Sequence, residues 1–130
     1  MKSFKELKVW QKGIELVEMI YKITASFPEE EKYGLSAQMR RAAVSIPSNI
    51  AEGHLRKTAK DFKQFLSIAR GSCAELETQI IISYKLGFIQ EDNFSDLSSR
   101  IEELSKMLSS LYSKINSKPL TNQTAKPLNR

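Results

Sequence analysis

The 130-residue chain is poor in the residues that build cross-linked or metal-bound proteins, with one cysteine and one histidine. One cysteine cannot form an internal disulfide, which excludes a small secreted scaffold held by disulfides. One histidine and one cysteine cannot supply the four ligands of a structural zinc site, so no metal or other cofactor is expected. No apolar run approaches the roughly 18 residues of a membrane span, and no apolar signal core follows the start. We therefore expect a soluble cytoplasmic protein.

Glycine and proline are also scarce, with five and four residues, so few positions interrupt regular structure. The hydrophobic fraction of 41% and the charged fraction of 27% are ordinary for a globular protein and too apolar for a disordered one. A chain of this length is expected to form one domain whose core needs neither disulfides nor metal.

Apolar residues recur at intervals of three and four along nearly the whole chain, and no convincing segment alternates with period two. The spacing predicts helices over about residues 6–26, 34–53, 58–86 and 93–116. Four long helices with short connections indicate an all-α fold, an antiparallel up-down-up-down four-helix bundle. We expect the bundle to occupy residues 1–116, and the polar residues 117–130 to form a disordered tail.

A few residues mark the ends of these helices. Pro28 ends the first helix, Thr58 and Asp61 resemble a capping box at the start of the third, and Gly87 stands where a C-terminal glycine cap belongs. Pro47 lies inside the second helical pattern. A proline there removes a backbone hydrogen bond, so we expect a kink or a break.

The net charge of +5 is unevenly spread along the sequence. Residues 40–70 carry seven basic and two acidic groups, whereas residues 71–98 have a net charge of −4. A basic block in an otherwise balanced chain favours a polyanionic partner such as nucleic acid. An excess of this size also serves solubility alone, and both interpretations stay open.

The basic residues of this block gather on one side of the third predicted helix and near its start. Those that could contact phosphates are Arg40, Arg41, Arg56, Lys57, Lys60, Lys63 and Arg70. Positive charge at repeated spacing suits a phosphate backbone, which needs no unique geometry. The alternative is a solvated helix face. The interleaved Phe62 and Phe65 are expected to pack in the bundle rather than stack on bases.

A second unusual surface is a polar, mostly uncharged face of the second predicted helix. One interpretation is a solvated surface. The other is the close approach of a neighbouring subunit, because small side chains permit close packing. The candidates for this subunit contact are Arg41, Ser45, Asn49 and Glu52.

Catalytic patterns are missing. The sequence has no phosphate-binding glycine loop, no dinucleotide motif and no Glu-x-x-His pair of the kind used in di-iron bundles. Cys73 falls on the apolar stripe of the third helix, where a thiol acts as a small buried hydrophobe. We therefore expect no catalytic residues and no enzyme activity.

Several segments together form a recognisable pattern. They are FKELKVWQK at 4–12, FPEEEKYGL at 27–35, QMRRAAVSIPSNIAEG at 38–53, FLSIARGS at 65–72 and ELETQ at 75–79. This pattern resembles the 23S ribosomal RNA intervening-sequence proteins, a family related to the accessory variability determinant of retroelements. The resemblance spans about residues 4–112. Gly13 departs from it, since alanine is common there, and His54 receives no role from it.

The resemblance implies a four-helix bundle, a ring-shaped homopentamer and a positively charged surface for nucleic acid, with no catalytic activity. It favours a non-enzymatic, oligomeric protein that binds the phosphate backbone, RNA being the expected form, although the residues do not separate RNA from DNA. It also favours a subunit-contact role for the polar face of the second helix. The alternative is a ring that serves as a scaffold for a protein partner such as a reverse transcriptase.

Overall fold

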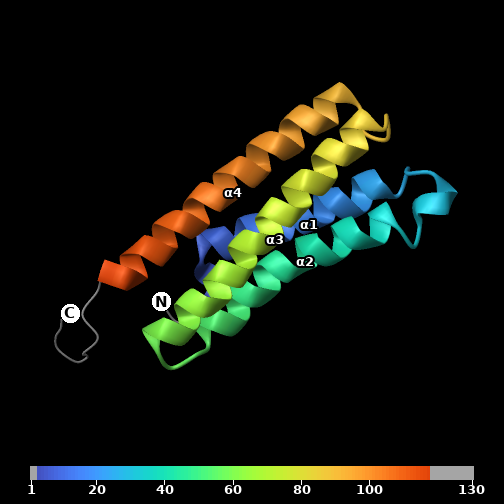
Figure 1. Cartoon of the computed structure of the whole chain (residues 1–130). Coiled ribbons are helices and arrows are strands. Elements are labelled where there is room, and N and C mark those ends of the chain that lie inside the picture. Colours follow the sequence, from blue (N-terminus) through green and yellow to red (C-terminus); the bar gives the residue numbers. More distant parts are fainter. Residues whose placement is uncertain (1–2, 118–130) are drawn as a thin grey trace.

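The computed structural model describes residues 3–117, and within them it contains helices and no strands (Figure 1). Two short 3-10 helices and four α-helices follow one another along the chain. They are η1 (Phe4–Glu6), α1 (Lys8–Thr24), η2 (Glu29–Glu31), α2 (Leu35–His54), α3 (Ala59–Lys85) and α4 (Glu91–Ser117). The predicted all-α four-helix bundle is confirmed. Of the tail expected at 117–130, Ser117 ends α4, and residues 118–130 lie outside the described part.

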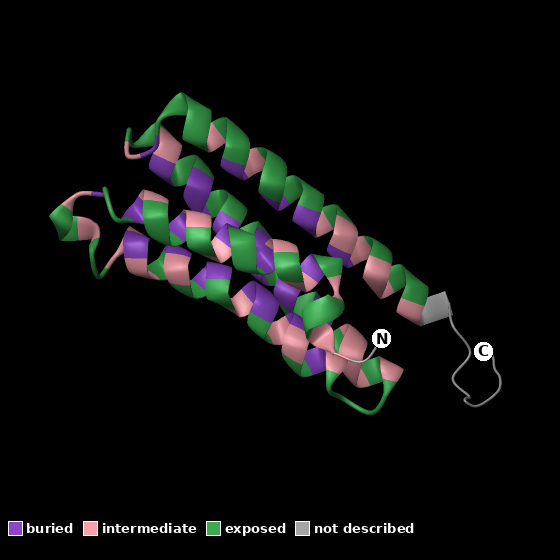
Figure 2. Ribbon diagram, turned by 180° about the vertical axis from the view of Figure 1, so that it is seen from behind, coloured by how far each residue is buried: buried purple, intermediate pink, exposed green. Residues whose placement is uncertain are grey.

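Each helix packs against its neighbour in sequence, and α4 returns to contact α1, which closes the bundle. The buried residues face the interior along all four helices, as the purple bands of Figure 2 show. Leu16, Met39, Leu76 and Leu104 are at most 1% exposed and represent the four contributions to this core. The stripes with spacing three and four form most of the core, as the sequence predicts, but Ile14 and Tyr21 of α1, which share that spacing, are exposed.

Both predicted ends of α3 are present. The Oγ1 atom of Thr58 accepts a hydrogen bond from the backbone N–H of Asp61 at 3.1 Å. At the other end Gly87 has φ +83°, its N–H donates to Tyr84 O at 3.0 Å, and the N–H of Phe88 donates to Ser83 O at 2.9 Å. This pair of bonds is a Schellman motif, which needs a residue in the left-handed region and therefore favours glycine.

The break considered at Pro47 does not occur, because α2 runs without interruption from Leu35 to His54. Pro47 is buried against α1, where a Cβ atom placed on Gly13 would lie 3.4 Å from Pro47 Cβ. Packing on both sides of α2 outweighs the loss of one backbone hydrogen bond. A proline can stand inside a helix when tertiary contacts compensate in this way.

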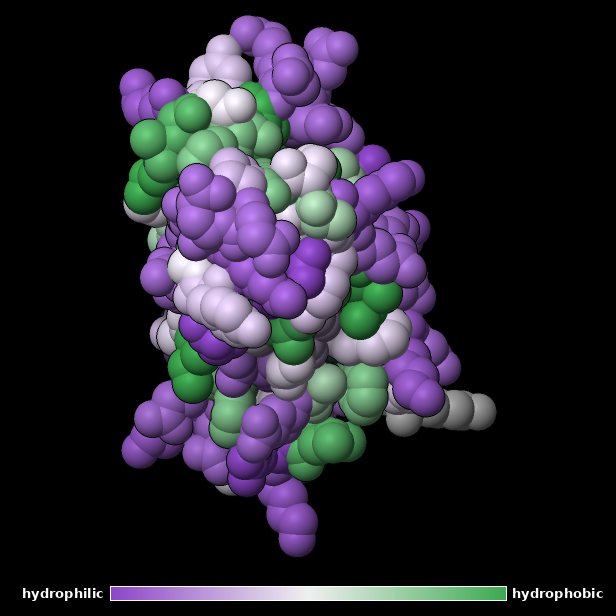
Figure 3. All heavy atoms as spheres, turned by 90° about the vertical axis from the view of Figure 1, so that its right-hand side faces the viewer, coloured by the Kyte–Doolittle hydropathy of each residue, from purple (hydrophilic) through white to green (hydrophobic). Residues whose placement is uncertain are grey.

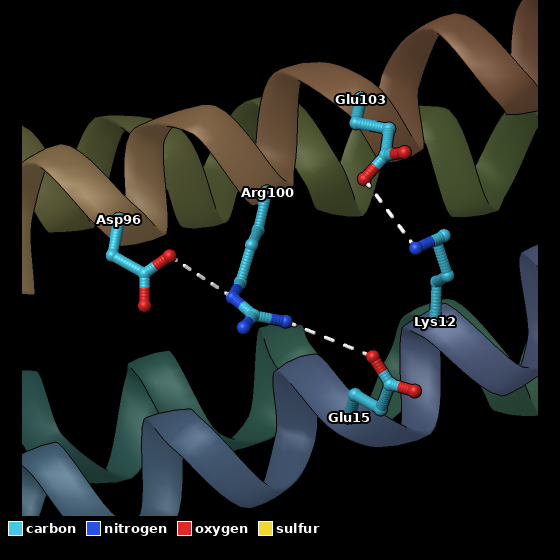
Figure 4. A network of polar contacts seen from close by, with 5 residues as sticks. All are labelled: Lys12, Glu15, Asp96, Arg100 and Glu103. Atoms are coloured by element: carbon cyan, nitrogen blue, oxygen red, sulfur yellow. Dashed lines mark hydrogen bonds and ion pairs between the residues drawn. The ribbon is translucent and has the colours of Figure 1, made fainter.

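Polar contacts bridge α1 and α4 at the surface (Figure 4). Arg100 lies 3.1 Å from Asp96 and 3.6 Å from Glu15, and Lys12 lies 3.6 Å from Glu103. These side chains are about half exposed, so each pair stabilises the fold by little. The seam between α1 and α4 therefore depends mainly on the apolar residues beneath it.

The end of the bundle that carries the α1–α2 and α3–α4 connections is covered mostly by hydrophilic residues, with apolar side chains in separate groups among them (Figure 3). None of the helices in residues 3–117 combines the length and the apolar character that a membrane crossing requires.

Candidate functional site

The fold separates charge between the two ends of the bundle. We cut each helix at its middle and define the basic end as residues 3–15, 45–72 and 104–117, which include the α2–α3 connection. This end holds ten Lys and Arg against four Asp and Glu, a formal charge of +6. The acidic end, residues 16–44 and 73–103, holds six basic against eleven acidic groups, a formal charge of −5. Figure 1 shows the α2–α3 connection at the end of the bundle opposite to the other two connections.

The sequence reveals only part of this polarity. The block at 40–70 is visible along the chain, but Lys5, Lys8, Lys106 and Lys114 join it only because the antiparallel packing brings the start of α1 and the end of α4 to the same end. An end with this excess attracts a polyanion over distances of about a Debye length, roughly 8 Å at physiological salt.

Two of the predicted phosphate contacts, Lys57 and Lys60, are exposed at the α2–α3 connection and the first turn of α3. Within residues 3–117 neither pairs with a carboxylate. Arg41 is also exposed and has no carboxylate partner there, but it lies in the acidic end. The charges of Lys57 and Lys60 are therefore not neutralised by a carboxylate of the described residues and are available to a ligand.

Arg40 instead makes its contacts within the fold. Its Nε donates to Thr24 Oγ1 at 2.8 Å, a terminal nitrogen donates to Tyr21 O at 3.2 Å, and the guanidinium lies 4.5 Å from the centre of the Tyr21 ring. The side chain thus caps the C-terminal turn of α1 and joins it to α2. We assign Arg40 a structural role.

The other three predicted cations rest on aromatic rings. Arg56 pairs with Glu52 at 2.9 Å and lies 4.7 Å from the centre of the Phe65 ring. Lys63 and Arg70, seven residues apart on α3, both lie over Tyr112 of α4, at 4.6 and 5.2 Å from the ring centre. Cation–π contacts of this kind hold flexible side chains in place while the charge stays exposed.

Next to Arg70, the surfaces of α3 and α4 form an open hollow of about 350 Å³, which we call the α3–α4 hollow. It is lined by Ser67, Arg70, Gly71, Ser105 and Ser109. Of these residues only Arg70 was picked out by its charge. The signal that could have pointed to the others is Gly71, a glycine in the middle of a strongly predicted helix.

The polar face of α2 finds partners within the chain. The hydroxyls of Ser45 and Ser72 share a hydrogen bond of 2.8 Å between α2 and α3, and Asn49 Nδ2 donates to the carbonyl oxygen of Ser45 at 2.8 Å and to its hydroxyl at 3.0 Å. Glu52 is held by Arg56, which leaves Arg41 as the one exposed predicted contact without a carboxylate partner among the described residues. Most of this face needs no second subunit to satisfy its polar groups.

An apolar groove of about 280 Å³ lies beside that face, between α1 and α2. Trp10, Ile14, Val44 and Pro47 are among its lining residues, with Val44 40% exposed. The sequence does not predict this groove, because Val44 lies outside the apolar stripe of α2.

The cysteine and the histidine of the chain both pack into the bundle. Cys73 is fully buried, as predicted, and burial raises the pKa of its thiol from 9.0 to about 11, with a smaller opposing effect from a hydrogen bond to Ser105. His54 packs edge-on against Phe62, with ring centres 5.9 Å apart, and its Nδ1 is buried without a hydrogen bond to the described residues. Among residues 3–117 no cluster of three or more histidine, cysteine or acidic side chains is placed to hold a metal.

Comparisons with known proteins agree with this architecture. The family model described as "23S rRNA-intervening sequence protein" matches residues 5–110. A solved structure from Bacteroides thetaiotaomicron, described as a protein of unknown function from the S23 ribosomal protein family, superposes with a TM-score of 0.73. It is 25% identical, and the match covers 80% of this chain and 97% of that one. No curated protein matches the sequence.

Proposed function

The chain belongs to the 23S rRNA-intervening sequence protein family, and on that premise we propose that it is a non-enzymatic protein that binds the phosphate backbone of nucleic acid, RNA in the first place. The observation that carries the proposal is the formal charge of +6 on the basic end, opposite a formal charge of −5 on the acidic end. A molecule polarised in this way approaches a polyanion with one end.

The proposed contacts are the exposed cations of the basic end, chiefly Lys57, Lys60 and Arg70. Lysine ammonium groups act as point charges toward phosphate, whereas an arginine guanidinium can donate two parallel hydrogen bonds. Phe65 and Tyr112 are already covered by cations, so we expect little stacking on bases. Binding would then be governed by charge and shape and would carry little sequence preference.

The test compares two variants that lose the same charge at opposite ends of the bundle. Lys57→Gln with Lys60→Gln removes two charges from the basic end, and Lys22→Gln with Lys85→Gln removes two from exposed positions of the acidic end. Fluorescence anisotropy with a structured RNA should show at least a tenfold weaker affinity for the first variant and less than a twofold change for the second. Equal losses in both would contradict the assignment of binding to the basic end.

Self-association is part of the same proposal. The resemblance implies a ring of five subunits, and the proposed contact surface is the polar face of α2 with Arg41, Ser45, Asn49 and Glu52. Its support in the fold is the exposed position of Arg41 beside the apolar groove between α1 and α2. Multi-angle light scattering measures the mass directly. A mass of five chains supports the ring, and a monomer at all concentrations contradicts it.

The alternative function is a scaffold for a protein partner such as a reverse transcriptase. One observation favours it: Ser45 and Asn49 make their hydrogen bonds within the chain. Because these side chains need no second copy of the chain, the neighbouring apolar groove is available to a different protein. A multimeric protein that fails to bind RNA and DNA even at about 50 mM salt would favour the scaffold.

A further inference from the structure

We propose that the α3–α4 hollow binds a single phosphodiester group of the nucleic acid, with Arg70 as its charged donor and the hydroxyls of Ser67 and Ser109 as its neutral donors. This inference rests on the proposed function and adds a specific anchoring point to it. The hollow is open to solvent and lined by polar residues, which suits a group that belongs to a longer chain and stays partly hydrated.

Two serine hydroxyls and the Arg70 guanidinium supply hydrogen-bond donors to the hollow. Among the described residues, no acceptor takes a hydrogen bond from the hydroxyls of Ser67 and Ser109. The Arg70 guanidinium has no carboxylate partner there, and its contact with the Tyr112 ring leaves its N–H groups available. A guanidinium and nearby hydroxyls form the donor set with which proteins hold phosphate oxygens.

An aromatic ring holds the Arg70 side chain in position. Tyr112 supports the guanidinium from α4, with Lys63 over the same ring. An arginine whose side chain is already positioned loses less conformational freedom on binding, because part of the entropic cost is met in the fold. Tyr112 is therefore a positioning residue, and its ring is what matters rather than its hydroxyl.

Gly71 also indicates room for a ligand. A glycine inside a helix is less favourable than alanine, unless a close neighbour leaves no room for a side chain. Here a Cβ atom would meet nothing within 4 Å. The packing of the bundle therefore does not require glycine at this position. A ligand lying against the α3 backbone in the hollow would require it, since a methyl group would occupy the same space.

The charges around the hollow agree with an anion. Lys63 stands one to two turns before the hollow on α3, and no carboxylate lines it. The nearest acidic groups along these helices, Glu75 and Glu103, lie beyond it toward the acidic end, and Glu103 is paired with Lys12 at 3.6 Å. The negative charge of Glu77 helps to raise the pKa of the buried Cys73 thiol. The hollow thus lies just inside the basic end.

The test uses an uncharged change, so that loss of fit is separated from loss of charge. Gly71→Ala in the full-length protein should raise the melting temperature, because alanine favours the helix, and should weaken the affinity for an oligouridylate at least fivefold. Ser113→Ala, an exposed change on α4 outside the hollow, is the matched control and should leave affinity within twofold. Gly71→Ala with raised stability and unchanged affinity would overturn the proposal.

A second arm identifies the ligand. Inorganic phosphate should displace the oligouridylate more strongly than chloride at equal ionic strength, and this difference should vanish in Arg70→Gln. Lys85→Gln makes the same change in charge at an exposed position of the acidic end and should keep the difference. Equal displacement by phosphate and chloride in the unmodified protein would contradict a phosphate seat. Inorganic phosphate could also saturate the hollow below millimolar concentration without being displaced by oligouridylate. That result would contradict the assignment of the hollow to nucleic acid.

The two proposals fail differently. If Lys57→Gln with Lys60→Gln weakens binding and Gly71→Ala does not, the basic end binds nucleic acid without the hollow. If neither variant changes affinity, both proposals are wrong. Tyr112→Phe should bind as the unmodified protein does, and Tyr112→Leu should lose affinity. A loss that is equal in both would contradict the positioning role of the ring.

Discussion

The Nε atom of Arg40 on α2 donates a 2.8 Å hydrogen bond to the Oγ1 atom of Thr24 on α1. Arg41, the next residue, is exposed and has no carboxylate partner in the described part of the chain. Adjacent arginines that look equivalent in the sequence therefore differ in role. One ties two helices together, and the other is available to a partner.

Arg40→Gln should destabilise the protein by about 1–2 kcal/mol, because it breaks two hydrogen bonds and leaves the buried Thr24 hydroxyl without its donor. Urea unfolding followed by circular dichroism measures this loss. RNA affinity, corrected for the folded fraction, should stay within twofold. Normal stability with weakened RNA binding would return Arg40 to the phosphate contacts.

Two glycines should respond to alanine in opposite directions. At Gly13 the added Cβ would lie 3.4 Å from Pro47 Cβ, an ordinary contact, so Gly13→Ala should stabilise the fold by about 0.5–1 kcal/mol. At Gly53 it would lie 2.7 Å from Phe65 Cβ, so Gly53→Ala should destabilise it by about 1–3 kcal/mol. Thermal unfolding of both variants checks the signs, and a shift in the same direction would show that the approach of α2 to its neighbours is described wrongly.

The ion pairs of Figure 4 should contribute little. Arg100→Gln removes contacts to Asp96 and Glu15 and should cost less than about 1 kcal/mol at low salt, because all three side chains are partly exposed. The difference from the unmodified protein should shrink further as salt screens the pairs. A cost that is large and independent of salt would mean that these residues also pack the seam between α1 and α4.

The buried Cys73 thiol is expected to lower the free energy of unfolding at alkaline pH. Well below pH 9 the thiol is protonated in both the folded and the unfolded chain and has no effect on pH dependence. Between pH 9 and about 11 the unfolded chain releases the thiol proton while the folded chain keeps it, so the free energy of unfolding falls as pH rises.

Chemical denaturation of the native protein and of Cys73→Ala over this pH range isolates the effect from the titration of tyrosine and lysine. The native protein should lose more stability with rising pH than the variant does. Parallel curves would show that the thiol is not buried in solution.

The fold could be predicted from the sequence because helical periodicity, the Thr58 cap and the Gly87 cap all act over a few residues. Of the kink or break expected at Pro47, the break does not occur, because the burial of Pro47 against Gly13 is a contact between distant segments, which local rules do not contain. The close approach of α2 and α3 at Gly53 has the same character.

The candidate site was predictable only as a charge pattern. The sequence places Lys57 and Lys60 in a basic block, and the structure keeps both exposed. Arg40 donates a hydrogen bond to Thr24, and Arg70 lies over the ring of Tyr112. Both contacts join pairs of helices that only the folded chain brings together. The α3–α4 hollow is likewise shared between two helices, and no single segment encodes it.

The most direct test of the account is the salt dependence of RNA binding in the unmodified protein and in the two double lysine variants. Each phosphate contact to a single strand contributes about 0.7 to the slope of log affinity against log salt. Lys57→Gln with Lys60→Gln should lower the slope by about 1.4, and Lys22→Gln with Lys85→Gln should leave it unchanged. A slope near zero in the unmodified protein, or the same slope in all three proteins, would contradict a phosphate-binding basic end.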